Sequence, residues 1–277
     1  MAIYSLSMRS VGRTTHAPGT AGAHMRYIAR ERAASEIMAN HIPEDANDAR
    51  AYVDAHEAGL RKNARIMDKI MIALPRELSD TERGQLVQDY MNDLTQCGRV
   101  PWYAALHQTE SDAHNPHAHV VVIDKDIETG KRVLALSDNR RDRIKKGLDP
   151  SAAEWVRERW EHHANAALER AGYDARIDRR SLEKQGIERE PQIHIGPNAQ
   201  HIDTFVRKPE SKIVPDPTAK NPERVIDYPM IDAGRTRRER VAEIIDFNLA
   251  KQARSEHFET RVMAQFEQEQ RSVERVL

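Results

Sequence analysis

The spacing of apolar and polar residues predicts a folded domain of strands and helices in the first part of the chain. Residues 2–8 and 66–74 are runs of β-compatible side chains, and Pro75 ends the second run, so both segments are predicted to be strands. From position 20 to about position 38, apolar residues recur at helical spacing and predict a helix. Two further apolar runs predict strands over residues 101–107 and 117–124.

Two more helices are predicted from their first residues and from apolar spacing. Ser79 and Glu82 have the capping-box spacing that marks a helix start. One side of that helix is formed by Leu86, Val87, Tyr90, Met91 and Leu94. A second long helix is predicted to follow Pro150 and to end near Gly172. Its apolar side consists of Trp155, Val156, Trp160 and Leu168.

The pattern changes after residue 200. Five prolines between residues 203 and 235 predict an extended linker, because proline removes a backbone donor and fixes φ. From residue 236 a charged sequence with apolar residues on one face predicts a long helix. We therefore predict a domain over residues 1–200, a linker over residues 201–235 and a helical tail over residues 236–277.

Composition excludes some classes of protein. Of 277 residues, 39% are hydrophobic and 31% are charged, and no apolar run approaches the roughly 20 residues of a membrane helix. The first residues lack the apolar block of a signal peptide. Cys97 is the only cysteine, so an intramolecular disulfide is impossible and a cytoplasmic location is expected.

Charge is clustered although the total is nearly balanced. The formal net charge is −1, which by itself counts against a nucleic-acid-binding protein. Local clusters matter more than the total for binding a polyanion. One stretch of seven residues contains Arg140, Arg141, Arg143, Lys145 and Lys146. These residues are predicted to contact DNA phosphates, although solvated helix ends would show the same pattern.

Histidines mark the most informative part of the sequence. His117 and His119 are two residues apart, which on a strand places both side chains on one face. His107 ends the preceding predicted strand, so pairing of the two strands would bring all three together. Three imidazoles can hold Mn²⁺, Mg²⁺ or Zn²⁺, and the spacing does not choose among them. An edge strand with surface histidines would also show this spacing.

Several segments in the same order resemble one family. The form NPHAH at residues 115–119, after His107, resembles the third motif of MobA/MobL-type relaxases, which are HUH endonucleases. MAIYSL at the start and AHMRYIARE around Tyr27 resemble its first strand and its nucleophile helix. The stretch at residues 165–197 resembles its downstream block. The resemblance covers about residues 1–198 and implies an α+β fold with an antiparallel sheet and flanking helices.

The resemblance also implies a chemistry. Tyr27 would attack a phosphodiester of single-stranded DNA at a plasmid transfer origin, keep the 5′ end as a phosphotyrosine and later rejoin the strand. A divalent ion on the three histidines, with Mg²⁺ or Mn²⁺ favoured over Zn²⁺, would orient the phosphate. Arg26 and Arg30 are expected to help the tyrosine ionise. Accessory mobilisation proteins and the coupling protein of a type IV secretion system are the implied partners.

Other interpretations stay open. Members of the family often have an acidic residue on the strand that precedes the Ala-Leu-Pro turn, which is residues 73–75 here. This chain has Lys69 and Met71 near that position, and Asp68 is the acidic residue available to assist the metal or the proton transfer. A non-catalytic DNA-binding regulator on a relaxase fold would explain that change. A rolling-circle replication initiator is the other alternative, although Tyr27 precedes the histidine pair, as in relaxases. Tyr27 could also be an aromatic side chain on a helix that packs in the core and has no catalytic role.

Overall fold

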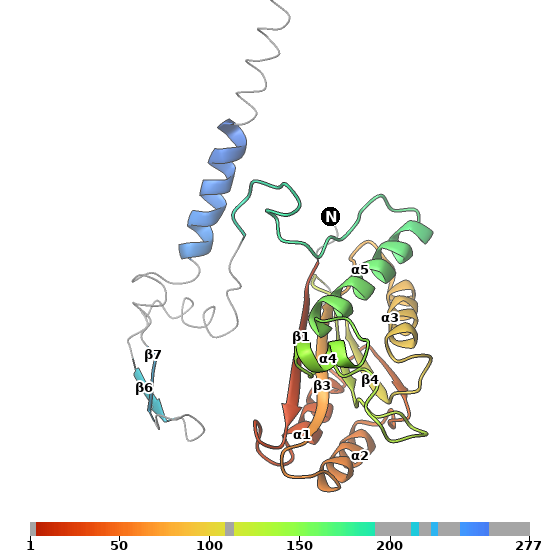
Figure 1. Ribbon diagram of the computed structural model, residues 1–277. Helices are drawn as coiled ribbons and strands as arrows, with labels where there is room; N and C mark the ends of the chain where they lie inside the picture. Colours follow the sequence, from red (N-terminus) through yellow and green to blue (C-terminus); the bar gives the residue numbers. More distant parts are fainter. Residues whose placement is uncertain (1–3, 109–113, 192–211, 216–222, 227–238, 255–277) are drawn as a thin grey trace, which may run out of the picture. The chain divides into compact units, whose positions relative to one another are not determined.

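The computed structural model describes residues 4–108, 114–191, 212–215, 223–226 and 239–254. The chain divides into two compact units, Met1–Arg179 and Arg180–Leu277, which are described separately. The first unit contains the five-stranded sheet and all five named helices (Figure 1). Among the described residues, no helix is both long and apolar enough to cross a membrane.

An antiparallel sheet forms the centre of the first unit. Its strand order is β1-β3-β5-β4-β2, and every neighbouring pair is antiparallel. The strands are β1 (Leu6–Gly12), β2 (Glu36–Asn40), β3 (Arg65–Ala73), β4 (Trp102–His107) and β5 (His117–Val122). The predicted α+β fold with an antiparallel sheet is therefore confirmed. The first strand begins later than predicted, since residues 2–8 were expected.

Helices cover both faces of this sheet. On one face, α1 (Thr20–Ile28) and α2 (Ala46–Ala58) form a core with the strands through residues such as Met25 and Val121. On the other face, α3 (Asp80–Leu94) and α5 (Ala152–Arg170) form a core that includes Trp160 and Val120. Because side chains alternate along a strand, Val120 and Val121 of β5 enter opposite cores. The same alternation fixes which face carries the histidines.

The chain between α1 and β3 differs from the prediction. The predicted helix over residues 20–38 ends at Ile28, and residues 36–40 form β2, which pairs with the edge of β4. Backbone hydrogen bonds to an existing sheet edge outweigh the weak helical preference of this segment. Helix α2 was not predicted from the apolar pattern, but Asp45 begins it by accepting from two backbone N–H groups.

The other predicted helices are present. Ser79 and Glu82 form the full capping box at the start of α3, with each side chain bonded to the other residue's backbone. Ser151 caps α5, which ends at Arg170, close to the expected Gly172. Between them, the short helix α4 (Arg140–Lys145) contains most of the predicted basic cluster.

The second unit is described only in part. Strands β6 (Lys212–Pro215) and β7 (Glu223–Ile226) pair antiparallel within the segment predicted to be an extended linker. Residues 239–254 are helical, within the predicted tail, and residues 255–277 lie outside the described part. The Asn248 side chain exchanges two hydrogen bonds with the backbone of Glu190. The limits predicted for the domain, the linker and the tail stay a prediction.

We predict that Asp68→Asn stabilises the protein at neutral pH. Asp68 is 2% exposed and accepts a hydrogen bond from Ser10, and burial raises its pKa from 3.8 to about 6. The folded state then binds the proton more tightly than the unfolded state, so stability falls as pH rises from about 4 to about 6. Asparagine keeps an acceptor for Ser10 without a charge, and should raise the free energy of unfolding by about 3 kcal/mol above pH 6.

Urea unfolding of both proteins on either side of this pH window measures the effect. Below about pH 3 the two curves should coincide, because Asp68 is then protonated in both states. Asp124→Asn is the control, since three backbone N–H groups donate to that carboxylate and its loss should lower stability. A lower stability of Asp68→Asn at neutral pH would contradict the prediction.

Candidate active site

Three histidines from two adjacent strands form a compact cluster on the α1/α2 face of the sheet. His117 and His119 lie on β5, and His107 ends β4 directly across the ladder from His117. Each imidazole offers one nitrogen, and these nitrogens lie within 4.8 Å of one another. The ring centroids are 4.7 to 5.1 Å apart. The structure therefore brings together the three residues that the sequence suggested as metal ligands.

Backbone carbonyls fix the tautomer of two of these rings. Nε2 of His107 donates to the carbonyl of Ile28 at 2.8 Å, and Nδ1 of His117 donates to the carbonyl of Asn115 at 2.9 Å. A carbonyl oxygen only accepts, so these nitrogens carry the protons. The lone pairs that a cation could take then belong to Nδ1 of His107 and Nε2 of His117. Such outer hydrogen bonds orient metal ligands in proteins.

The third ring is kept neutral. Burial, followed by the effect of His107 and His117, lowers the pKa of His119 from 6.5 to about 3. Neutral imidazole is the form that binds metal ions. Three imidazoles on one face leave further coordination positions open to an oxygen ligand. This set of donors fits a divalent cation.

Tyr27 lies on α1 beside this cluster. The side chain is 57% exposed, and its ring stacks on that of His24 with centroids 6.4 Å apart. His24 in turn meets the ring of His119 edge to face, also at 6.4 Å. Tyr27, His24 and the three histidines therefore form one continuous group. Tyr27 is at the outer side of this group, where a polymeric substrate can reach the phenol.

The two predicted arginines have different positions around Tyr27. The guanidinium of Arg30 lies 4.2 Å from the centroid of the Tyr27 ring and donates to the Tyr27 carbonyl at 3.2 Å. A cation over an aromatic face is attracted to the ring and to negative charge that develops on its oxygen. Arg26 is exposed and precedes Tyr27 by one residue, so its side chain leaves the helix about 100° away. Arg30 is therefore the arginine placed at the nucleophile.

A positively charged cavity of about 290 Å³ opens next to His119. Arg9 of β1 and Lys69 of β3 are paired across the ladder, and both line it. Burial, with Arg9 nearby, lowers the pKa of Lys69 below its ordinary value. Besides these cations and His119, the polar side chains that line the cavity are Ser7 and His24. Cations beside the histidines are a suitable environment for a phosphate group.

Comparison with known proteins places this arrangement in a family. The sequence profile of the MobA/MobL family matches residues 19–204. The matched segment is more than half of the chain and contains Tyr27 and the three histidines. The chain belongs to the MobA/MobL family.

Curated members of the family are similar to this chain over most of its length. Mobilization protein A of Escherichia coli is 35% identical over 220 residues, which is 73% of this chain and 30% of that protein. Mobilization protein MobL of Acidithiobacillus ferridurans is 30% identical over 250 residues, 73% of this chain and 64% of the relative. The chain therefore spans less than two thirds of the length of these MobA/MobL proteins.

Solved structures with a similar shape are more distant. One, described as the molecular basis of vancomycin resistance transfer in Staphylococcus aureus, has a TM-score of 0.47 and 19% identity, and the match covers 65% of this chain and all of the other. The metal-bound conjugative relaxase TrwC in complex with oriT DNA has a TM-score of 0.43 and 16% identity, over 73% of this chain and 82% of the other. The fold itself follows from the strand order described above.

Asp68 is not near the histidines of this MobA/MobL protein. It pairs with Val122, which belongs to the α3/α5 core, whereas His117 and His119 lie on the α1/α2 face. Asp68 therefore cannot assist a metal on the histidines or the tyrosine, and that expectation is corrected. The residue opposite His119 in the ladder is Met71, which is 42% exposed.

The basic cluster around α4 also lies apart from the histidines. Arg143 is buried, and its guanidinium donates to the carbonyls of Leu134, Ala135 and Asp149. It holds the loop before α5 in place and is not available to DNA, which corrects its predicted role. Leu134 belongs to the α3/α5 core, so this loop lies on the face opposite the histidines. The exposed cations that remain are Arg140, Arg141, Lys145 and Lys146.

Sequence reasoning missed three residues of the site. Strand pairing brings Arg9 and Lys69 beside His119, and the packing of α1 on the sheet brings His24 there. His24 precedes Tyr27 by three residues, so on a helix the two side chains share a face. That spacing within the tyrosine motif was a usable signal. Neither Arg9 nor Lys69 has a local signal of this kind.

Proposed function

We propose that this chain is a relaxase that nicks one DNA strand at a transfer origin, as an early step of plasmid mobilisation. The observation that carries the proposal is the continuous group formed by Tyr27, His24 and the three histidines on one face of the sheet. Membership of a family whose relatives are called mobilization proteins supports it. A nucleophile and a candidate cation site side by side are what transfer of a phosphoryl group requires.

In the proposed reaction Tyr27 attacks the scissile phosphorus. A bond forms between its phenolic oxygen and phosphorus, and the bond from phosphorus to the 3′ oxygen breaks. The phenol loses its proton, and the 3′ oxygen gains one as it leaves as a hydroxyl. The phosphotyrosine conserves the bond, so attack by a 3′ hydroxyl runs the same step backwards and rejoins a strand. Arg30, over the ring of Tyr27, stabilises the negative charge that develops on its oxygen.

The histidines are proposed to hold a divalent cation. When bound, such an ion supplies positive charge to the non-bridging oxygens of the scissile phosphate. The chain's contribution is to keep His119 neutral through burial and to orient His107 and His117 through the carbonyls of Ile28 and Asn115. The imidazole donors suit several divalent ions. Magnesium or manganese is our proposal for the ion used.

Several cations are proposed to guide the DNA strand. Arg9 and Lys69 line the cavity next to His119, so we assign them to the phosphate beside the scissile one. Arg26 is exposed on the nucleophile helix and can contact the strand there. Arg140, Arg141, Lys145 and Lys146 are exposed on the other side of the sheet and would contact DNA farther from the nick. Accessory mobilisation proteins and a secretion coupling protein stay proposed partners.

Covalent capture of DNA is the test of this function. The protein is incubated with a single-stranded oligonucleotide from a transfer origin, with Mn²⁺, with Mg²⁺, or with a chelator. A relaxase should give a protein band of lower mobility on a denaturing gel, with either metal and not with the chelator. DNA binding without an adduct under all conditions would refute the proposal and favour a non-catalytic regulator.

A further inference from the structure

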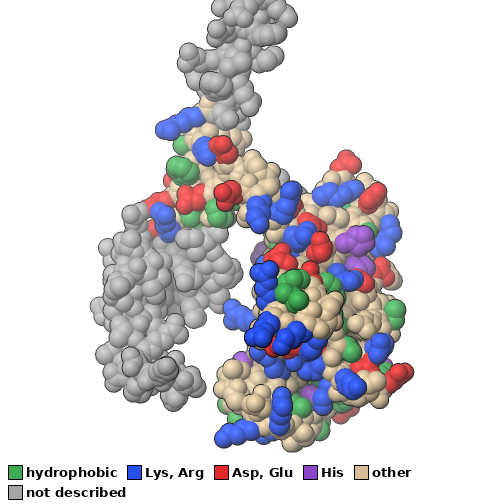
Figure 2. Space-filling view, viewed as in Figure 1, with side chains coloured by type: hydrophobic (Ala, Val, Ile, Leu, Met, Phe, Trp, Pro, Cys, Tyr) green, Lys and Arg blue, Asp and Glu red, His purple; other side chains and the backbone are tan. Residues whose placement is uncertain are grey.

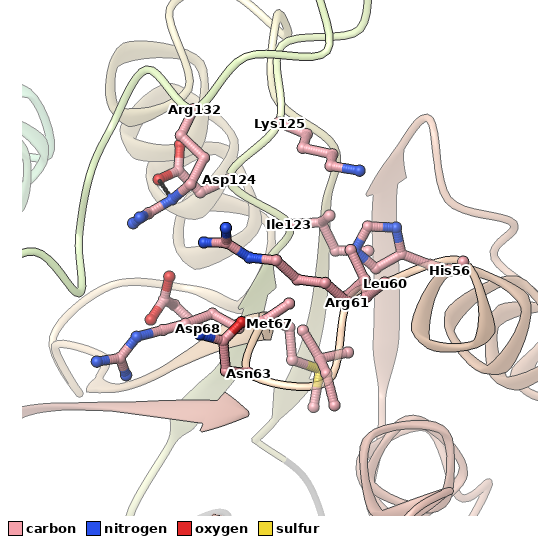
Figure 3. A pocket seen from close by; sticks show the side chains of 14 residues that line it. His56, Leu60, Arg61, Asn63, Met67, Asp68, Ile123, Asp124, Lys125 and Arg132 are labelled. Carbon is pink, nitrogen blue, oxygen red and sulfur yellow. Dashed lines mark hydrogen bonds and ion pairs between the residues drawn. The ribbon is translucent and has the colours of Figure 1, made fainter. Parts of the chain in front are cut away.

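A second, larger cavity lies at the opposite end of the sheet from the histidines. Its volume is about 510 Å³, and it forms where β3 begins and just beyond the end of β5, a strand that is roughly 17 Å long from His117 to Val122. Figure 3 shows side chains from α2, the α2–β3 loop, β3 and the loop after β5 around one opening. We call this cavity the basic pocket. Its charged residues are Arg61, Arg65, Lys125, Arg132, Asp68 and Asp124.

The two acids of the basic pocket are already satisfied. Asp124 accepts from the backbone N–H groups of residues 133, 134 and 135, at 2.8 to 3.0 Å, and from Nε of Arg132 at 3.1 Å. Asp68 is buried and accepts from the hydroxyl of Ser10. Neither carboxylate therefore needs a further cation from the rim. Arg132 is the one rim cation that these acids hold.

Two cations of the rim have no such partner. Arg61 and Lys125 are both exposed, and within the described part of the chain neither makes an ion pair. They come from different loops and line the same opening (Figure 3). Arg65 donates a hydrogen bond to the carbonyl of Ser137, at 3.3 Å, and makes no ion pair with another described residue. The rim of the basic pocket therefore has an excess of positive charge.

The base of the pocket is apolar. Leu60, Ile66, Met67 and Ile123 line it, and the last three are almost completely buried. Cations above an apolar base match a phosphodiester with an attached sugar or base, whose charged and apolar parts are adjacent. A small inorganic anion would use only the rim.

The basic pocket is continuous with the exposed cations of α4. Asp138 pairs with Arg132 at 2.6 Å and with Lys146 at 2.6 Å, so it bridges the pocket and the end of α4. Lys and Arg side chains gather on the face of the molecule over α4 and the neighbouring loops (Figure 2). The remaining exposed cations of this helix are Arg140, Arg141 and Lys145. A strand seated in the pocket would continue onto positive surface.

We propose that the basic pocket binds a phosphodiester of the DNA strand outside the cleavage site, and that α4 extends this contact. The proposal rests on the proposed function, because the same DNA must reach both ends of the sheet. The pocket then anchors the strand, while the histidines and Tyr27 act on a phosphate at the other end of β5, roughly 17 Å away. The basic pocket and α4 then supply part of the affinity for DNA, although neither takes part in the cleavage reaction.

The test removes the two unpaired cations together. Arg61→Ala/Lys125→Ala is compared with Lys62→Ala/Lys131→Ala, a matched control that also removes two exposed positive charges from the same loops, outside the pocket lining. The full chain is titrated with a fluorescent single-stranded oligonucleotide of about 30 nucleotides over a range of salt concentrations. Thermal melting checks that both variants are folded.

The pocket variant should bind about tenfold more weakly, and its log Kd should depend less steeply on log salt by about 0.7, the contribution of one phosphate contact on a single strand. The control should stay within about twofold of the unchanged protein. Equal losses in both variants, or no loss in the pocket variant, would overturn the proposal. Adduct formation by the unchanged protein is scored separately, so failure of the pocket and failure of the nicking function are distinguishable.

Discussion

Replacing Tyr27 by phenylalanine should abolish the covalent protein–DNA adduct, with a loss of at least about 1,000-fold in nicking rate. The substitution removes only the attacking oxygen and leaves the ring that stacks on His24 and lies under Arg30. Because the side chain is 57% exposed, its loss of a hydroxyl should not change stability measurably. DNA affinity, measured by fluorescence anisotropy, should stay within about twofold, since most affinity comes from phosphate contacts.

Tyr52→Phe is the matched control for that substitution. Tyr52 is also a partly exposed tyrosine on a helix, and it lies on α2. The control should form the adduct at the rate of the unchanged protein. Adduct formation by Tyr27→Phe at a normal rate would show that another residue is the nucleophile.

The second large effect on cleavage is expected when one histidine of the cluster is replaced. His119→Ala should lower metal-dependent cleavage by about 100-fold or more, because it removes one of three ligands and leaves the remaining pair to position a cation. His119 also lies between His107 and His24, so its loss separates the nucleophile side of the site from the cluster. Isothermal titration with Mn²⁺ should show weaker binding by a similar factor.

His162→Ala provides the control for the histidine variant. His162 is exposed on α5, which packs on the opposite face of the sheet, so neither cleavage nor Mn²⁺ affinity should change. Cleavage that persists in His119→Ala with unchanged dependence on Mn²⁺ would place the cation elsewhere.

The histidine cluster could be predicted because its geometry is local. His117 and His119 face the same side through the two-residue period of a strand, and that period needs no knowledge of the fold. His107 required one further assumption, that β4 and β5 are neighbours, and their ladder confirms it. Tyr27 came from the family motif, since an exposed helix tyrosine has no signal of its own.

The incorrect predictions have a physical cause. Asp68 was considered as an assisting acid, yet it is three residues from Met71, which faces His119, and an odd separation on a strand means opposite faces. The first residues of β2, up to Met38, were predicted to be helical because the pairing partner of β2, β4, lies far away in the sequence. The basic pocket could not be predicted either, since Arg61, Lys125 and Arg132 meet only through the tertiary fold.

Mass spectrometry of the trapped adduct tests the central claim most directly. After reaction with an oligonucleotide, nuclease digestion and trypsin, cleavage behind Arg26 and Arg30 releases residues 27–30 as the peptide YIAR. The account predicts that the 5′-phosphate of the nicked strand is attached to the tyrosine of this peptide. A phosphotyrosine on a peptide containing Tyr4, Tyr52 or Tyr173, with residues 27–30 unmodified, would contradict it.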